Sequence, residues 1–111
     1  MGTPAEGDER AFFDVRQGDT PGVRRLPLTN EASKDGSLPA RFKELVAVAI
    51  AVNQGCEDCI VFHLANASKH GASRQELVEV LGVAVEMGGG PGSVYAAKAL
   101  AAFDDMASTS G

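Results

Sequence analysis

The sequence contains few bulky aromatic residues. Its 111 residues include no tryptophan, one tyrosine and five phenylalanines, while hydrophobic residues make up 44% of the chain, much of it alanine and valine. A chain of this length forms a single domain with a modest core. Because small aliphatic side chains gain less from burial than aromatic ones, we expect an oligomeric interface to cover part of the apolar surface.

An excess of positive charge and a long apolar run are also missing. The net charge is −5, and no basic stripe with interleaved aromatic residues is present, which argues against a nucleic-acid partner. The longest apolar run, Leu45–Val52, has eight residues, whereas a membrane-spanning helix needs roughly 20. Residues 1–10 are polar and acidic, unlike a signal peptide. We therefore predict a cytoplasmic protein without a membrane partner.

Cysteine is scarce, and its two copies lie close together. Cys56 and Cys59 are three residues apart, and His63 follows four residues later. On a helix, Cys59 lies about 60° and His63 about 20° around the axis from Cys56, so the three side chains share one stripe. In a reducing cytosol an isolated CxxC is more often redox-active, catalytic or metal-binding than structural. The stripe predicts a redox or nucleophilic site.

Hydrophobic periodicity and helix-capping residues predict an all-α domain. Helices are expected over residues 38–54, 56–70, 73–87 and 93–106. Ser37 is the expected N-cap of the first helix, and Gly55 is its expected C-terminal cap. Ser73 and Glu76 form a capping box, and Gly88–Gly92 is expected to break the chain between the last two helices.

Three segments are expected along the chain: an N-terminal arm over residues 1–37, the helical domain over 38–107 and a tail over 108–111. Within the arm, a short helix begins at Ala11, and residues 18–37 are irregular, with Leu26 and Leu28 as anchors on the core. About five to six helices result, including a helical hairpin that carries the CxxC pair, and the assembly is oligomeric.

The helix expected over residues 38–54 is apolar on both faces. The i, i+3, i+4 pattern assigns one face to the core through Phe42, Leu45, Val46, Ala49 and Ile50. Val48 and Val52 make the other face apolar as well, so we expect a second subunit to cover one of the two faces. In the later helices the predicted inward residues are Leu77, Val80, Leu81, Ala84, Val94, Ala97, Leu100 and Ala101, with Ala96 and Phe103 as further candidates.

The thiols gain reactivity from their position. A thiolate, not a thiol, is the nucleophile, and the first turn of a helix favours an anion. Because His63 lies one turn beyond Cys59, it can accept the proton of Cys59, which makes Cys59 the candidate nucleophile. After oxidation of Cys59 to a sulfenic acid, attack by Cys56 would release water and close the disulfide.

Glu44 is a candidate third member of the site. Along a straight helix it lies about 18 Å from Cys56. It could reach the cysteines only if the helix is broken, packs at a steep angle or serves a neighbouring subunit.

The spacing of these four residues resembles a known family. Glu44, eleven residues, Cys56, two residues, Cys59, three residues and His63 match the motif of the alkylhydroperoxidase D-like branch of the carboxymuconolactone decarboxylase superfamily. The resemblance covers roughly residues 38–103, and its further matching segments are His70–Leu77 and Met87–Pro91.

The resemblance implies an all-helical protein that assembles into trimers or hexamers, of which the hexamer is favoured. It implies a thiol peroxidase or disulfide oxidoreductase in which Cys59 reacts with peroxide, Cys56 resolves it, and Glu44 and His63 form a proton relay. No bound cofactor or metal is implied. Reduction would come from an external dithiol on a partner protein, of lipoyl type in the founding system.

One departure and several alternatives accompany this reading. The founding peroxidase has a histidine immediately before its second cysteine, where this chain has Asp58; an inward-pointing acid there would disfavour the Cys59 thiolate. The alternatives are a decarboxylase-like lyase with incidental thiols, a non-enzymatic thiol redox sensor or scaffold, and a zinc site formed by Cys56, Cys59 and His63.

Overall fold

The computed structural model describes residues 26–110, and this part of the chain forms four helices without strands. They are α2 (Leu26–Ser33), α3 (Ala40–Gln54), α4 (Glu57–Lys69) and α5 (Arg74–Ser110). Two compact units divide the chain, Met1–Lys34 with α2 and Asp35–Gly111 with the other three helices. The predicted all-α class is confirmed. The short helix predicted at Ala11 lies outside the described residues.

Helix α2 corrects the prediction of irregular structure for residues 26–33, whereas residues 18–25 of that predicted segment lie outside the described residues. Pro27 is its second residue, where the missing N–H of proline removes no intrahelical hydrogen bond, and Leu, Glu and Ala favour the helical state. Leu28, which was predicted to be an anchor on the core, is part of this helix. An ion pair between Lys34 and Glu31, 2.7 Å apart, follows the helical spacing.

The two ends of α3 have different capping. The predicted N-cap Ser37 is wrong: Pro39 occupies that position without a side-chain bond, and Asp35 Oδ1 instead accepts a hydrogen bond of 2.6 Å from the N–H of Ala40. The predicted C-terminal cap is confirmed. Gly55 has φ 67°, a left-handed conformation that glycine adopts without strain, and its N–H donates to the Val52 carbonyl. This turn lets α4 fold back along α3.

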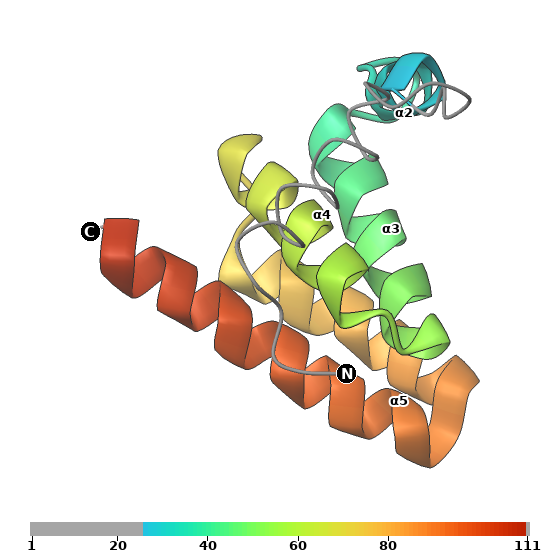
Figure 1. Cartoon of the computed structure of the whole chain (residues 1–111), viewed down its shortest axis with the longest axis vertical. Coiled ribbons are helices and arrows are strands. Elements are labelled where there is room, and N and C mark those ends of the chain that lie inside the picture. The colour runs from blue at the N-terminus through green and yellow to red at the C-terminus, as the bar shows by residue number, and fades with distance from the viewer. Residues whose placement is uncertain (1–25, 111) are drawn as a thin grey trace, which may run out of the picture. The chain divides into compact units, whose positions relative to one another are not determined.

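Helix α5 contains a sharp kink at Gly89, which has φ 67° and ψ −145°. The predicted break over Gly88–Gly92 is therefore confined to one residue, and Pro91 fits into the first turn after it. Figure 1 shows the chain turning back there. A hydrogen-bonded ion pair of 2.8 Å between Arg74 and Asp104 joins the beginning of the first segment to the end of the second. Helical structure continues to Ser110, beyond the predicted start of the tail at residue 108.

The core lies where α3, α4 and both segments of α5 meet. Its largest side chains come from every one of these helices and include Leu45, Val48, Val52, Ile60, Leu64, Leu77, Leu81 and Phe103. The predicted inward positions Leu77, Leu81 and Ala84 are buried. In the second segment the candidates Ala96 and Phe103 are buried, as is Ala99. The prediction is wrong for Val94, Ala97 and Ala101, which are exposed.

The buried face of α3 is only partly the predicted one: Leu45 is buried and Ala49 packs against the core, but the other three predicted residues do not face it. Phe42, Val46 and Ile50 are 42%, 40% and 53% exposed, whereas Val48 and Val52 are buried. Both faces are apolar, so periodicity could not decide which one faces the core. The consequence for the site is that the core-facing side of α3 carries a carboxylate, Glu44.

Candidate active site

The two cysteines form a disulfide at the start of α4. Cys56 is the N-cap residue of the helix, and its Sγ accepts a hydrogen bond of 3.2 Å from the N–H of Cys59. Their Cα atoms are 5.3 Å apart, a distance that a disulfide spans. Both cysteines are partly exposed. The sulfur atoms therefore lie at the positive end of a helix dipole and within reach of a reactant.

Glu44 and His63 form a second pair behind the disulfide. Oε1 of Glu44 lies 2.6 Å from Nδ1 of His63, and the Glu44 side chain is 4% exposed. Helix α3 is continuous, so the first of the three expected routes from Glu44 to the cysteines, a broken helix, does not apply. Instead, the fold-back at Gly55 brings the later part of α4 alongside the earlier part of α3. Glu44 thereby contacts the histidine rather than the sulfur atoms.

The orientation of His63 follows from this contact. With its proton on Nδ1, the imidazole donates to Glu44, and Nε2 carries a free lone pair. Residues four apart on a helix are neighbours, and side chains lean toward the helix N-terminus, so His63 leans toward the turn that carries Cys59. The Phe62 ring lies edge-on to the imidazole at a centroid distance of 5.0 Å. The arrangement can therefore accept a proton from the Cys59 thiol once the disulfide is reduced.

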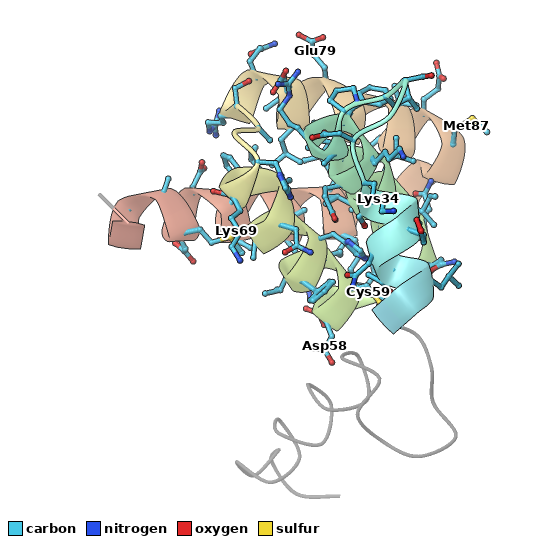
Figure 2. The ribbon with its side chains drawn as sticks, turned by 90° about the horizontal axis from the view of Figure 1, so that it is seen from above. Lys34, Asp58, Cys59, Lys69, Glu79 and Met87 are labelled. Carbon is cyan, nitrogen blue, oxygen red and sulfur yellow. A yellow bond between two sulfur atoms is a disulfide. The ribbon has the colours of Figure 1, made fainter. Side chains whose placement is uncertain are left out.

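The acids between the cysteines point away from them. Figure 2 shows Asp58 projecting outward from the helix, and both Glu57 and Asp58 are exposed. Solvent thus screens the Asp58 carboxylate, which reduces the penalty that an inward acid would impose on a Cys59 thiolate. Glu57 forms an ion pair of 3.3 Å with Lys98 from α5.

Lys98 is a residue near the site that the sequence analysis missed. It follows Glu57 by 41 positions, and no local pattern links a surface lysine on one helix to a particular turn of another. Figure 2 shows Glu79, in the first segment of α5, projecting into solvent.

The zinc alternative has no support in the geometry. No group of three or more histidine, cysteine or acidic side chains in the described part of the chain is arranged to hold a metal ion. Cys56 and Cys59 are bonded to each other, and Nδ1 of His63 is hydrogen-bonded to Glu44.

Among the helices in the described part of the chain, none combines the length and apolar character needed to cross a membrane.

Comparison with known sequences identifies the class of protein. Residues 24–102, most of the chain, match the carboxymuconolactone decarboxylase family, and the chain belongs to this family. The match begins upstream of the resemblance recognised from motifs alone and includes α2.

Two relatives by sequence carry no functional description. An uncharacterized protein of Cupriavidus necator is 60% identical over 75 residues, which cover 68% of this chain and 66% of the relative. The chain thus spans slightly less than two thirds of that relative. Uncharacterized protein 4 in the cox locus of Paracoccus denitrificans is 38% identical over 81 residues, which cover 73% of each chain.

Two solved structures share the fold. A carboxymuconolactone decarboxylase family protein from Legionella pneumophila is 42% identical, with a TM-score of 0.79 and coverage of 89% of this chain and 90% of its own. A family protein from Thermotoga maritima, for which involvement in antioxidative response has been suggested, is 25% identical with a TM-score of 0.79. That alignment covers 95% of this chain and 90% of its own.

Proposed function

We propose that this family member is a thiol-dependent peroxidase or disulfide oxidoreductase. The observation that carries the proposal is the hydrogen bond between buried Glu44 and His63, placed one helical turn beyond a disulfide at a helix N-terminus. A disulfide alone could be structural. A disulfide beside a carboxylate–imidazole pair has a group that can remove and return the thiol proton. The suggested antioxidative involvement of the Thermotoga relative agrees with this chemistry.

The reaction begins with the reduced protein. His63 accepts the proton of the Cys59 thiol at Nε2, and Glu44 stabilises the resulting imidazolium. The Cys59 thiolate attacks the terminal oxygen of a hydroperoxide and breaks the O–O bond. A sulfenic acid forms on Cys59, and the alkoxide leaves as an alcohol after taking the proton from His63.

The second cysteine completes the cycle. The Cys56 sulfur attacks the Cys59 sulfenic acid, releases water and forms the disulfide seen in the structure. An external dithiol, carried by a reducing protein, then returns both cysteines to thiols and becomes a disulfide itself. The net reaction consumes one hydroperoxide and one dithiol and yields an alcohol, water and one disulfide. A reducing compartment such as the cytoplasm would supply the electrons.

Turnover of an organic hydroperoxide with dithiothreitol as the reductant tests these roles. Cys59→Ser should abolish turnover, whereas Cys56→Ser should accumulate a Cys59 sulfenic acid or a mixed disulfide. Val83→Ala, a change on the exposed surface of α5, is the matched control and should turn over like the wild type. Wild-type rates in both cysteine variants would exclude the mechanism. Activity on a lactone that survives loss of both cysteines would support the lyase chemistry of the family instead.

We also propose that the chain forms a homo-oligomer through the exposed face of α3. Phe42, Val46 and Ile50 lie four residues apart and make one apolar stripe on this face. A second copy of this chain is the expected partner, since the same helix already buries its opposite face. Light scattering should show that Ile50→Glu dissociates the assembly and that Ile50→Leu leaves it intact. A monomeric wild type would contradict this proposal.

A further inference from the structure

A lysine from α5 lies against the turn that carries the disulfide. Nζ of Lys98 is 3.3 Å from Oε1 of Glu57, the residue between the helix N-cap Cys56 and Asp58. The same ammonium group lies 5.4 Å from the centroid of the Tyr95 ring, close enough for a cation–π interaction. The ion pair with Glu57 therefore places Lys98 at the first turn of α4, and Tyr95 supports the ammonium group from α5 itself.

Tyr95 ties this arrangement to the backbone of the site. Its ring packs so closely on Gly55 that a Cβ there would lie 3.4 Å from the ring carbon atoms. Gly55 directly precedes Cys56, and Tyr95 packs against the hydrophobic core. The position of Lys98 is thus set by an element anchored beside the disulfide.

We propose that Lys98 sets the redox balance of the Cys56–Cys59 pair by offsetting the negative charge of Glu57. The proposal rests on the redox function proposed above. The first turn of α4 carries two carboxylates, Glu57 and Asp58. Each carboxylate disfavours a thiolate in its neighbourhood. Lys98 contributes the opposite charge from α5, on the side of the helix where Glu57 lies.

The charge of Lys98 acts on the equilibrium between the Cys56–Cys59 disulfide and the reduced dithiol. Two molecules of glutathione reduce the Cys56–Cys59 disulfide: one S–S bond breaks in the protein, one forms between the glutathione molecules, and two protein thiols result. A free cysteine has an ordinary pKa of about 8.5, so thiolates contribute to the reduced state of such a dithiol at pH 8. A nearby positive charge stabilises that reduced form and shifts the equilibrium away from the disulfide, as in other CxxC proteins whose reduced state is favoured.

The side chains of Lys98 and Glu57 are 52% and 62% exposed, so their pair contributes little to folding. Replacing Lys98 should therefore leave the structure intact while changing the charge beside the sulfur atoms. The effect of Lys98 on the redox equilibrium can therefore be measured in the folded protein.

The test is a glutathione redox titration of the full chain at pH 8 and low salt, with thiols counted by alkylation and intact mass. Lys98→Met should lower the equilibrium constant for reduction by roughly two- to five-fold, the size expected for one exposed charge pair. Glu57→Gln should raise it by a similar factor. Lys98→Arg keeps the charge and should match the wild type, and Lys98→Met with Glu57→Gln should return close to it.

The dependence on salt is an independent test, because screening at high ionic strength should shrink the differences between the reduction equilibrium constants of the variants. Equal constants for the wild type and Lys98→Met at low salt would overturn the inference, as would Lys98→Arg behaving like Lys98→Met. A wild-type disulfide that no dithiol reduces would instead refute the redox function itself, so the two failures are distinguishable.

Discussion

Two glutamates, Glu44 and Glu57, form hydrogen-bonded pairs that involve α4, but one carboxylate is buried and the other is exposed. Glu44, from α3, has a 4% exposed side chain and bonds to His63 at 2.6 Å. Glu57, on α4 itself, has a 62% exposed side chain and lies 3.3 Å from Lys98 of α5. Water screens an exposed pair and replaces a lost partner, but it does neither for a buried carboxylate. Glu44 can therefore take part in catalysis, whereas the exposed pair of Glu57 and Lys98 can only adjust the reactivity of the cysteines.

The largest expected difference is in catalysis. Glu44→Gln keeps the size of the side chain and an oxygen acceptor but removes the charge that stabilises a protonated His63. We expect hydroperoxide turnover to fall by about 10²-fold or more, the usual size of a general acid–base contribution. Glu57→Gln, the matched control on the exposed side, should change turnover by less than about five-fold. Steady-state kinetics with an organic hydroperoxide measures both.

A double variant shows whether Glu44 acts through the histidine. If it does, Glu44→Gln combined with His63→Gln should be hardly slower than His63→Gln alone, because residues that act as a unit are not additive. Fully multiplicative losses would show that the two side chains act independently and would break the comparison.

The free energy of unfolding should depend much more on a buried valine than on an exposed one. Val48 is 0% exposed and Val83 is 60% exposed, and both lie in helices. Val48→Ala should lower the free energy of unfolding by about 1–3 kcal/mol through lost burial and an unfilled cavity. Val83→Ala should change it by less than about 0.5 kcal/mol. Denaturant titration with an unchanged slope tests this, and equal losses would contradict the assigned core.

The smallest effect is expected at the exposed pair that joins the ends of α5. Hydrogen bonding and charge from Arg74 lower the pKa of Asp104. Because the folded pKa lies below the unfolded one, the stabilisation is present above the ordinary Asp pKa of about 3.9 and is lost as the pH falls through the folded value. Asp104→Asn should therefore lower the melting temperature slightly at pH 7, and the difference should vanish in acid below the folded pKa. A difference that persists there would exclude this pair as its source.

Local signals predicted much of the fold. The αL turn at Gly55 and the capping box of Ser73 and Glu76 need only neighbouring residues, and the structure contains both. Helix α2 was missed because prolines and polar residues around it favour irregular structure. The buried face of α3 could not be predicted, since Val48 and Val46 mark equally apolar faces and only the packing of α4 and α5 distinguishes them.

In the candidate site, too, the arrangement within one helix was predictable from the sequence, whereas contacts between helices were not. Spacing along one helix predicted that Cys56, Cys59 and His63 share a stripe, because helical geometry alone sets it. The family resemblance implied that Glu44 works with His63, but their direct contact depends on how α4 folds back on α3, and helical spacing along one helix could not predict it. Lys98 depends on a third helix and left no local trace.

Intact mass of the pre-reduced protein after one equivalent of organic hydroperoxide shows whether Cys59 and Cys56 form a working redox pair. We expect a rapid loss of about 2 Da per chain, reversed by a dithiol, as the two cysteines form their disulfide. In Cys56→Ser the mass should instead rise by about 16 Da, the mass of the sulfenic oxygen on Cys59. An unchanged mass, with both thiols still open to alkylation, would contradict the proposed redox pair.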